Sequence, residues 1–315
     1  MKRRYLAVFV CALAMCFAVV LAGCQSKAYE PEALEPTVST PVIGQNGELR
    51  VGVDTSSSPF AGQANGGIVG LDVDTAAALA DQLGLKLKVV DVADDGVGAL
   101  ANGSVDIVLG VPQSTQEDGV WLSEPYLQTA VSLFAASDNG TIPTSASAPS
   151  IAAQSSSMSA WAVENIFGEA ALVPCGDLTS AFSSIETGAA SYVASDAVIG
   201  TYAAKTNNVD VRIIGLLENP GGYCIAVSAD NEKLQKAVGD ALTAVKSGGI
   251  LKVIDTKWLG SDLDLSTLPL VEGAGASVAS AASAEGEAAN GDGMATGAAA
   301  AGSNAVLPNG SVAGA

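Results

Sequence analysis

Hydrogen-bonding side chains are concentrated in one short segment of this chain. The sequence VPQSTQEDG (111–119) follows an apolar run (105–109) and contains Gln113, Ser114 and Thr115, with no Lys or Arg among its residues. Amides and hydroxyls both donate and accept hydrogen bonds, and loops that follow buried strands often carry ligand contacts. The segment therefore indicates a contact with a small polar molecule rather than with a strongly anionic one.

Acidic side chains follow two further apolar runs, at Asp54 and Asp196. Acids at the ends of apolar strands can form charge-assisted hydrogen bonds or cap the segment that follows. The 315 residues include no His, which excludes a Ser-His-Asp relay and removes the commonest zinc ligand. We expect neither a metal nor another cofactor. The net charge of −19 also argues against nucleic acid as a partner.

The first residues have the anatomy of an export signal. Lys2, Arg3 and Arg4 precede an uncharged apolar run (5–21), and LAGC closes it with small residues before Cys24. We predict a lipoprotein signal peptide over residues 1–23, with acyl chains on Cys24 that anchor the protein to the extracytoplasmic face of the cell membrane. An ordinary secretory signal or a single membrane span is the alternative.

Two cysteines, Cys175 and Cys224, remain after the leader and Cys24 are set aside. An even pair in an oxidising compartment is compatible with one disulfide, and two buried free thiols are the alternative. Their separation in sequence fits no metal-binding motif.

The middle of the chain alternates strand and helix patterns, which predicts mostly parallel sheets covered by helices in an α/β fold. The same helix–glycine–strand order occurs before and after residue 150, so we expect two lobes. The expected strands are 49–53, 85–92, 105–110, 150–154, 191–195 and 222–228, and the expected helices are 72–84, 177–188 and 231–260.

The two flanking segments differ in composition from this core. Residues 24–47 contain three prolines and little periodicity, which is typical of a flexible tether. Residues 263–315 are mostly Ala, Gly and Ser without Lys, Arg or aromatic residues, so we expect a disordered tail.

Several motifs in order resemble the extracytoplasmic solute-binding proteins of ABC importers, in the polar-amino-acid group. They are LRVGVDTSSSPF, GGIVGLDVDTAAALADQLG, SVDIVLG, LSEPY, YVASDAVIG and GYCIAVSADNEKLQKAVGDALTAVKSGGILKVIDTKWLG, between residues 48 and 260. The resemblance implies a two-lobed type II periplasmic-binding-protein-like fold with a central ligand cleft. It implies lobe one at 48–133 plus 227–262, lobe two at 137–223, and two hinge crossings at 130–137 and 222–228.

The resemblance also implies ligand-binding positions in both lobes. Asp196 matches the acid that meets the ligand amine, with a helix N-cap as its alternative role, and Asp54 matches an acid in the first-strand loop, where loop capping is the alternative. Ser156 and Ser157 match a hydroxyl-rich loop that holds carboxylates, or cap a helix. Phe60 is a ligand contact or, more often at this position, a structural residue.

One implied residue is absent. The family carries an Arg in the loop after the SVDIVLG motif, where it clamps the ligand carboxylate, but this chain has Gln116 or Asp118 there, depending on the count. Either Gln113, Ser114, Thr115 and backbone amides hold the carboxylate, or the ligand is an amine-bearing relative of an amino acid. Glu117 and Asp118 as a solvated loop are the alternative.

The resemblance implies a non-enzymatic function. We expect a monomeric, lipid-anchored protein that captures a small polar solute and delivers it to the transmembrane subunits of an ABC permease. A dehydratase-like enzyme on the same fold, with Asp196 as base, is one alternative. A surface sensor that no longer transports is the other.

Overall fold

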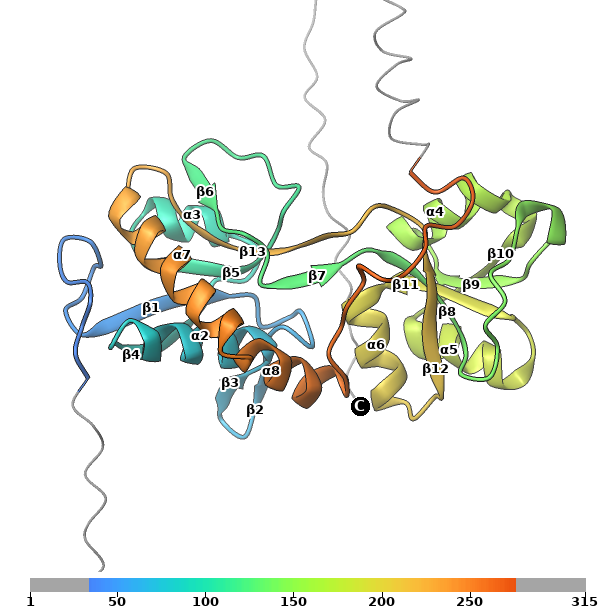
Figure 1. The fold of residues 1–315 in the computed structure, drawn as a ribbon, viewed down its shortest axis with the longest axis horizontal. Coiled ribbons are helices and arrows are strands. Elements are labelled where there is room, and N and C mark those ends of the chain that lie inside the picture. The colour runs from blue at the N-terminus through green and yellow to red at the C-terminus, as the bar shows by residue number, and fades with distance from the viewer. Residues whose placement is uncertain (1–33, 276–315) are drawn as a thin grey trace, which may run out of the picture. The chain divides into compact units, whose positions relative to one another are not determined.

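A computed structural model describes residues 34–275, and the predicted signal peptide, Cys24 and residues 276–315 lie outside the described residues. Two mixed sheets organise this part of the chain (Figure 1). The first sheet has the order β4-β1-β5-β13-β6, with β7 also paired to β13. Its strands are β1 (Glu48–Val53), β4 (Lys86–Asp91), β5 (Ile107–Pro112), β6 (Val120–Leu122), β7 (Leu127–Thr129) and β13 (Gly221–Ser228).

The second sheet has the order β10-β9-β11-β8-β12, in which β9, β10 and β11 run parallel and β8 runs antiparallel to β11 and β12. A separate hairpin precedes the first long helix. The second-sheet strands are β8 (Val131–Ala136), β9 (Ile151–Gln154), β10 (Leu172–Cys175), β11 (Tyr192–Asp196) and β12 (Val211–Leu216), and the hairpin is β2 (Gly62–Ala64) with β3 (Gly67–Val69). The predicted α/β class is confirmed.

Helices α2 (Leu71–Gln82), α7 (Glu232–Ser247) and α8 (Ile250–Leu259) belong to the first sheet's core, and the short α3 (Gly96–Ala101) packs on a smaller cluster of the same sheet. The sequence spacing predicts a buried stripe of Leu234, Val238, Ala241 and Val245 in α7, and it is confirmed, since all four are buried. For α2 the apolar spacing predicts a buried face of Val73, Ala76, Ala77, Ala80 and Leu83. The observed face is rotated from this, because Leu79 and Thr75 are buried while Ala77 is exposed.

The second sheet is covered on both faces, as a largely parallel sheet requires. Helix α4 (Met158–Phe167) contributes to one core cluster, while α5 (Leu178–Thr187) and α6 (Ala197–Thr206) contribute to the other, where Phe134 meets Phe182 edge to face. Two short 3-10 helices, η1 (Ser145–Ser147) and η2 (Glu169–Ala171), lie in the connections.

The passages between the sheets are shorter than the predicted crossings, and the second passage precedes its predicted range. The expected crossing at 130–137 is in fact β8, a full strand of the second sheet, and the passage is at Ala130. The expected crossing at 222–228 is β13, which pairs throughout with first-sheet strands, so the passage lies at 217–220. Apolar strand residues mark burial but not which sheet they join, and this caused both errors.

The predicted tether is shorter than 24–47. Residues 35–47 pack on the first core, with Ile43 fully buried and the Thr37 N–H donating to the Leu83 carbonyl at 3.0 Å. Gly84 has a φ of +66°, and a Cβ there would lie 2.1 Å from the Glu35 oxygen. Glycine is therefore required where this segment crosses the end of α2.

The predicted disordered tail also begins too early. Residues 263–275 form a closing segment: Leu265 is buried with Ala130, Ala197 and Leu216. Leu216 N–H donates to the Pro269 carbonyl, and the Val271 N–H donates to the Leu216 carbonyl, both at 2.9 Å. The closing segment thus adds a short pairing to β12, the edge strand of the second sheet.

Within residues 34–275, no helix combines the length and the apolar character needed to cross a bilayer.

Candidate functional site

Asp196 stands at the junction of the two sheets. It ends β11 and caps α6, with its Oδ1 accepting the N–H groups of Val198 and Ile199 at 2.9 Å. Its Oδ2 accepts the Thr129 hydroxyl at 2.5 Å and the Tyr223 hydroxyl at 3.4 Å. The helix-cap alternative is therefore confirmed, and the same carboxylate joins the second sheet to β7 and β13 of the first. Its contact with a ligand remains a prediction.

The two titratable side chains of this junction, Asp196 and Tyr223, are both largely buried. Burial raises the pKa of Asp196, and the donors from Thr129 and the α6 backbone oppose that rise. Burial, with the charge of Asp196, likewise raises the pKa of the Tyr223 phenol, which stays neutral. A cation placed beside Asp196 would favour the charged form of this carboxyl group and oppose the effect of burial.

Phe60 reaches the same cluster through Tyr223. Their ring centroids are 4.5 Å apart in a tilted arrangement, and Phe60 is only 6% exposed within the first core. The structural role considered for Phe60 is therefore supported by its burial. Tyr223 is the residue that brings Phe60 and Asp196 together.

The loop after β5 is attached next to Tyr223. The Gln113 N–H donates to the Gly222 carbonyl at 2.8 Å, and the Thr115 N–H donates to the Pro112 carbonyl at 3.0 Å. The side chains of Gln113 and Ser114 are exposed. The root of this loop thus lies beside the Asp196 cluster, with an amide and a hydroxyl facing outward.

The two serines lie at the start of α4, directly after β9. Ser157 caps the helix by accepting the Ala160 N–H at 3.1 Å, and Ser156 is exposed with a φ of +59°. The capping alternative is confirmed for Ser157. Both sit beyond the carboxyl end of a parallel strand, where ligands of open α/β sheets bind, so their ligand contact remains a prediction.

Asp54 organises its own loop. Its carboxylate accepts the Ser56 N–H and the hydroxyls of Ser56 and Ser57 at 2.6–2.9 Å. Burial acts to raise the pKa of Asp54, but these hydrogen bonds outweigh it and lower that pKa. The loop-capping role is confirmed, and within residues 34–275 no hydrogen bond joins Asp54 to the Asp196 cluster.

The loop after β5 lacks the arginine that the family carries there, and Arg50 does not take its place. Its guanidinium makes two bonds to Asp106, at 2.7 and 3.1 Å, and a third to the Gly103 carbonyl. Asp106 also accepts the backbone N–H groups of Gly44 and Arg50. This buried pair holds the 35–47 segment, β1 and β5 together and leaves the arginine fully engaged.

Sequence reasoning missed Thr129 and Tyr223, which complete the cluster. Tyr223 reads as an ordinary strand residue in GYCIAVS, and Thr129 lies in a short strand without a pattern of its own. The sequence signal that could have found them is a hydroxyl-bearing residue close to each passage between the sheets.

Of the two alternatives for the cysteines, the disulfide is not formed. Cys175 ends β10 in the second sheet, Cys224 lies in β13 of the first, and both are free cysteines. The free-thiol alternative holds. The described part of the chain also contains no group of three or more Cys, Asp or Glu side chains placed to bind a metal ion.

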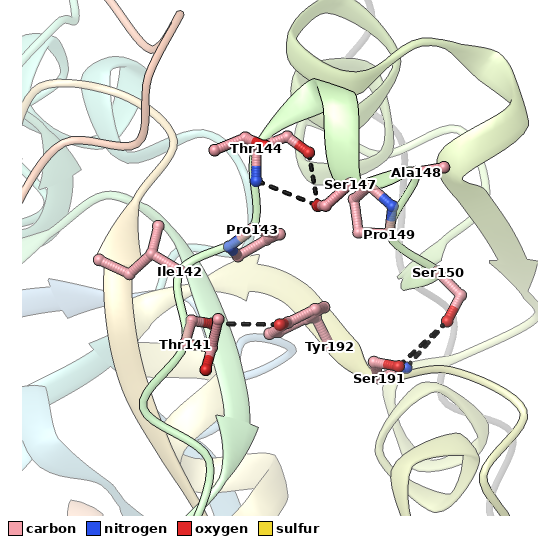
Figure 2. Close-up of a pocket in the computed structure, with 10 residues that line it drawn as sticks. All are labelled: Thr141, Ile142, Pro143, Thr144, Ser147, Ala148, Pro149, Ser150, Ser191 and Tyr192. Atoms are coloured by element: carbon pink, nitrogen blue, oxygen red, sulfur yellow. Dashed lines mark hydrogen bonds between the residues drawn. The ribbon is translucent and has the colours of Figure 1, made fainter.

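A cavity of about 510 Å³ lies elsewhere, between the 141–150 segment and the start of β11 (Figure 2). Tyr192 donates its hydroxyl to the Thr141 carbonyl across it, and Ser150 contacts Ser191. Its walls carry no charged side chain. Ser150 and Ser191 precede β9 and β11, so this cavity is at the opposite strand ends from Asp196.

Comparison with known proteins agrees with this architecture. The sequence model of the bacterial extracellular solute-binding proteins, family 3, matches residues 49–261, more than half of the chain. An L-cystine-binding protein of Escherichia coli is 25% identical over 252 residues, covering 78% of this chain and 92% of that protein. A glutamine-binding protein of a Bacillus subtilis ABC transporter is 25% identical over 269 residues, covering 81% and 98%.

Solved structures are similar as well. An ancestral cationic amino acid solute-binding protein has a TM-score of 0.59 at 26% identity, covering 68% of this chain and 96% of that one. The unliganded, open L-cystine solute receptor of Neisseria gonorrhoeae has a TM-score of 0.60 at 23% identity, covering 68% and 94%, which shows the fold. The predicted type II periplasmic-binding-protein fold is confirmed, and the chain belongs to the bacterial extracellular solute-binding proteins, family 3.

Proposed function

We propose that this protein captures an amino acid, or an amine-bearing relative, between two lobes built on the two sheets and delivers it to an ABC permease. The observation that carries the proposal is the Asp196 cluster, where a carboxylate of the second sheet meets Thr129 and Tyr223 of the first. A ligand amine bound at Asp196 would contact both lobes at their junction and favour their closure.

The relatives support the solute class. The curated ones are named for cystine and glutamine, and a similar solved structure is titled as a cationic amino acid binder. These solutes share an α-amine, which suits Asp196, and a carboxylate. In the absence of a basic residue in the 113–119 loop, the carboxylate would be held by Gln113, Ser114 or Thr115 and by Ser156 or Ser157.

Binding rather than catalysis is supported by the relatives, which are named as binding proteins. Both oxygens of Asp196 accept two hydrogen bonds each from the protein, which fixes the orientation of the carboxylate. A ligand amine would therefore share these oxygens with Thr129 and Tyr223 or replace one of them as donor. Recovery of an unchanged solute by mass spectrometry after incubation would support the binding function.

The direct test is calorimetry with L-glutamine, L-cystine and L-arginine. We expect at least one to bind and to raise the unfolding free energy, by about 2.7 kcal/mol at a hundredfold excess over Kd. Asp196→Asn should abolish that binding. Asp177→Asn is the matched control, because Asp177 also caps a second-lobe helix through its carboxylate but lies away from the cluster. Failure of all three solutes to bind would contradict the proposal.

Membrane attachment through Cys24 is part of the same proposal. Cys24→Ala should move the protein from the membrane fraction into the soluble one if acyl chains anchor it. Equal membrane retention of both forms would contradict lipid attachment at this residue.

A further inference from the structure

A recess of about 300 Å³ lies between α4 and the 217–220 passage to β13. Met158 and Trp161 line it from the helix, and Leu217 and Glu218 line it from the passage. The passage leads directly to Tyr223, and Met158 follows Ser157. The recess therefore adjoins two of the elements that form the candidate site.

Its helix wall consists of large apolar side chains exposed to solvent. Met158 is 67% exposed and Trp161 is 50% exposed, and their spacing of three residues places them together on one face of α4. Adjacent exposed side chains of this size are uncommon on a monomer unless they contact a ligand or partner. An indole face and a thioether both attract cations and the methylene groups attached to them.

Its opposite wall carries an oriented carboxylate. Glu218 Oε1 accepts the Val131 N–H at 2.7 Å, and the second oxygen makes no hydrogen bond or ion pair within residues 34–275. Burial raises the pKa of Glu218, and the nearby charge of Asp196 adds to that rise. No Lys or Arg lines the recess, so this carboxylate is not neutralised there by the lining residues.

We propose that this recess binds the cationic end of the solute's side chain, an ammonium or guanidinium group on an aliphatic stem. Glu218 accepts its hydrogen bonds, and Trp161 with Met158 packs against the stem. The inference rests on the proposed function, because it places the solute's α-amine at Asp196 and assigns this second acid to its far end.

The test compares L-arginine with L-citrulline, its neutral near-isostere, by calorimetry on the full chain. We expect arginine to bind at least about tenfold more tightly, the value of one good charge-assisted hydrogen bond. Glu218→Gln keeps Oε1 as the acceptor for Val131 and should reduce the arginine-to-citrulline ratio about tenfold. Trp161→Leu should weaken both ligands together, because they share the stem.

Glu164→Gln is the matched control, since Glu164 is an exposed acid on α4 that does not line the recess. Its ratio should equal that of the unmodified protein. Equal binding of arginine and citrulline, or an unchanged ratio in Glu218→Gln, would overturn the inference. Binding of L-glutamine or L-cystine without arginine would overturn it while leaving the proposed function intact, whereas no binding of any of the four would remove both.

Discussion

Asp72 gives this acidic protein an unusual dependence of stability on pH. It lies in the first turn of α2, is 2% exposed, and accepts the Tyr126 hydroxyl, which itself accepts the Gly110 N–H at 3.0 Å. Burial raises its pKa from 3.8 to about 7 although the Tyr126 bond acts to lower it. The folded protein therefore keeps a proton between about pH 4 and pH 7 that the unfolded chain has released.

The consequence is a loss of stability as the pH rises. The folded state binds more protons than the unfolded state in this window, so the free energy of unfolding decreases from about pH 4 to about pH 7 and then levels off. A pKa displaced from 3.8 to about 7 corresponds to roughly 4 kcal/mol at neutral pH. Asp255 in α8 acts in the same direction, because burial, with the charge of Asp262, also raises its pKa to about 7.

Urea unfolding at about pH 5 and about pH 8 measures this difference directly. Asp72→Asn preserves an oxygen for the Tyr126 hydroxyl but cannot titrate, so its difference should be smaller than that of the unmodified protein, and Asp72→Asn with Asp255→Asn should reduce it further. Asp196 and Glu218, whose pKa values burial also raises, contribute to the remainder. Asp91→Asn is the control, because the pKa of Asp91 is lowered and its titration falls below the window. An equal pH dependence in the unmodified protein and in Asp72→Asn would refute the reasoning.

Three further perturbations test the fold. Leu265→Ala, in the closing segment, should lower the free energy of unfolding by about 2–5 kcal/mol. Leu270→Ala, at a half-exposed position, should change it by less than about 1 kcal/mol. Equal effects of the two variants in chemical denaturation would argue against a packed segment. Asp106→Asn should lower the free energy of unfolding by about 3–5 kcal/mol, because Arg50 loses its partner. Asp240→Asn breaks an exposed pair with Lys236 and should lower it by at most about 1 kcal/mol. A small effect of Asp106→Asn would show that Arg50 finds another partner. Reductant should leave the melting temperature unchanged, because Cys175 and Cys224 are free. A thiol reagent should modify the partly exposed Cys175 before the buried Cys224. A fall in melting temperature on reduction would indicate a disulfide between them.

The repeating α/β pattern could be predicted because its signals are local. The α7 stripe and the Gly188 stop after α5 both follow from periodicity and capping. The passages between sheets could not be located, because the residues of β8 and β13 are apolar in either sheet. The closing segment was missed because Leu265 and Val271 stand among small and polar residues, and only their contacts with β12 and Ala130 distinguish them from a tail.

The candidate site was predictable only in part. Asp196 and Ser157 were found by motif, and their capping roles are visible in the structure. Tyr223 and Thr129 depend on the junction between the sheets, which no local pattern encodes. Trp161 and Glu218 are brought to one recess by α4 and the passage before β13, although they lie far apart in the sequence.

The position of β13 between β5 and β6 bears on the order in which the protein folds. The second sheet is made entirely from a contiguous stretch, 131–216, whereas the first sheet lacks β13 until residue 228 has been synthesised. We therefore expect the amides of the second sheet to gain protection against hydrogen exchange first. The first sheet cannot extend beyond β5 until β13 is available, and β13 begins more than a hundred residues after β5 ends.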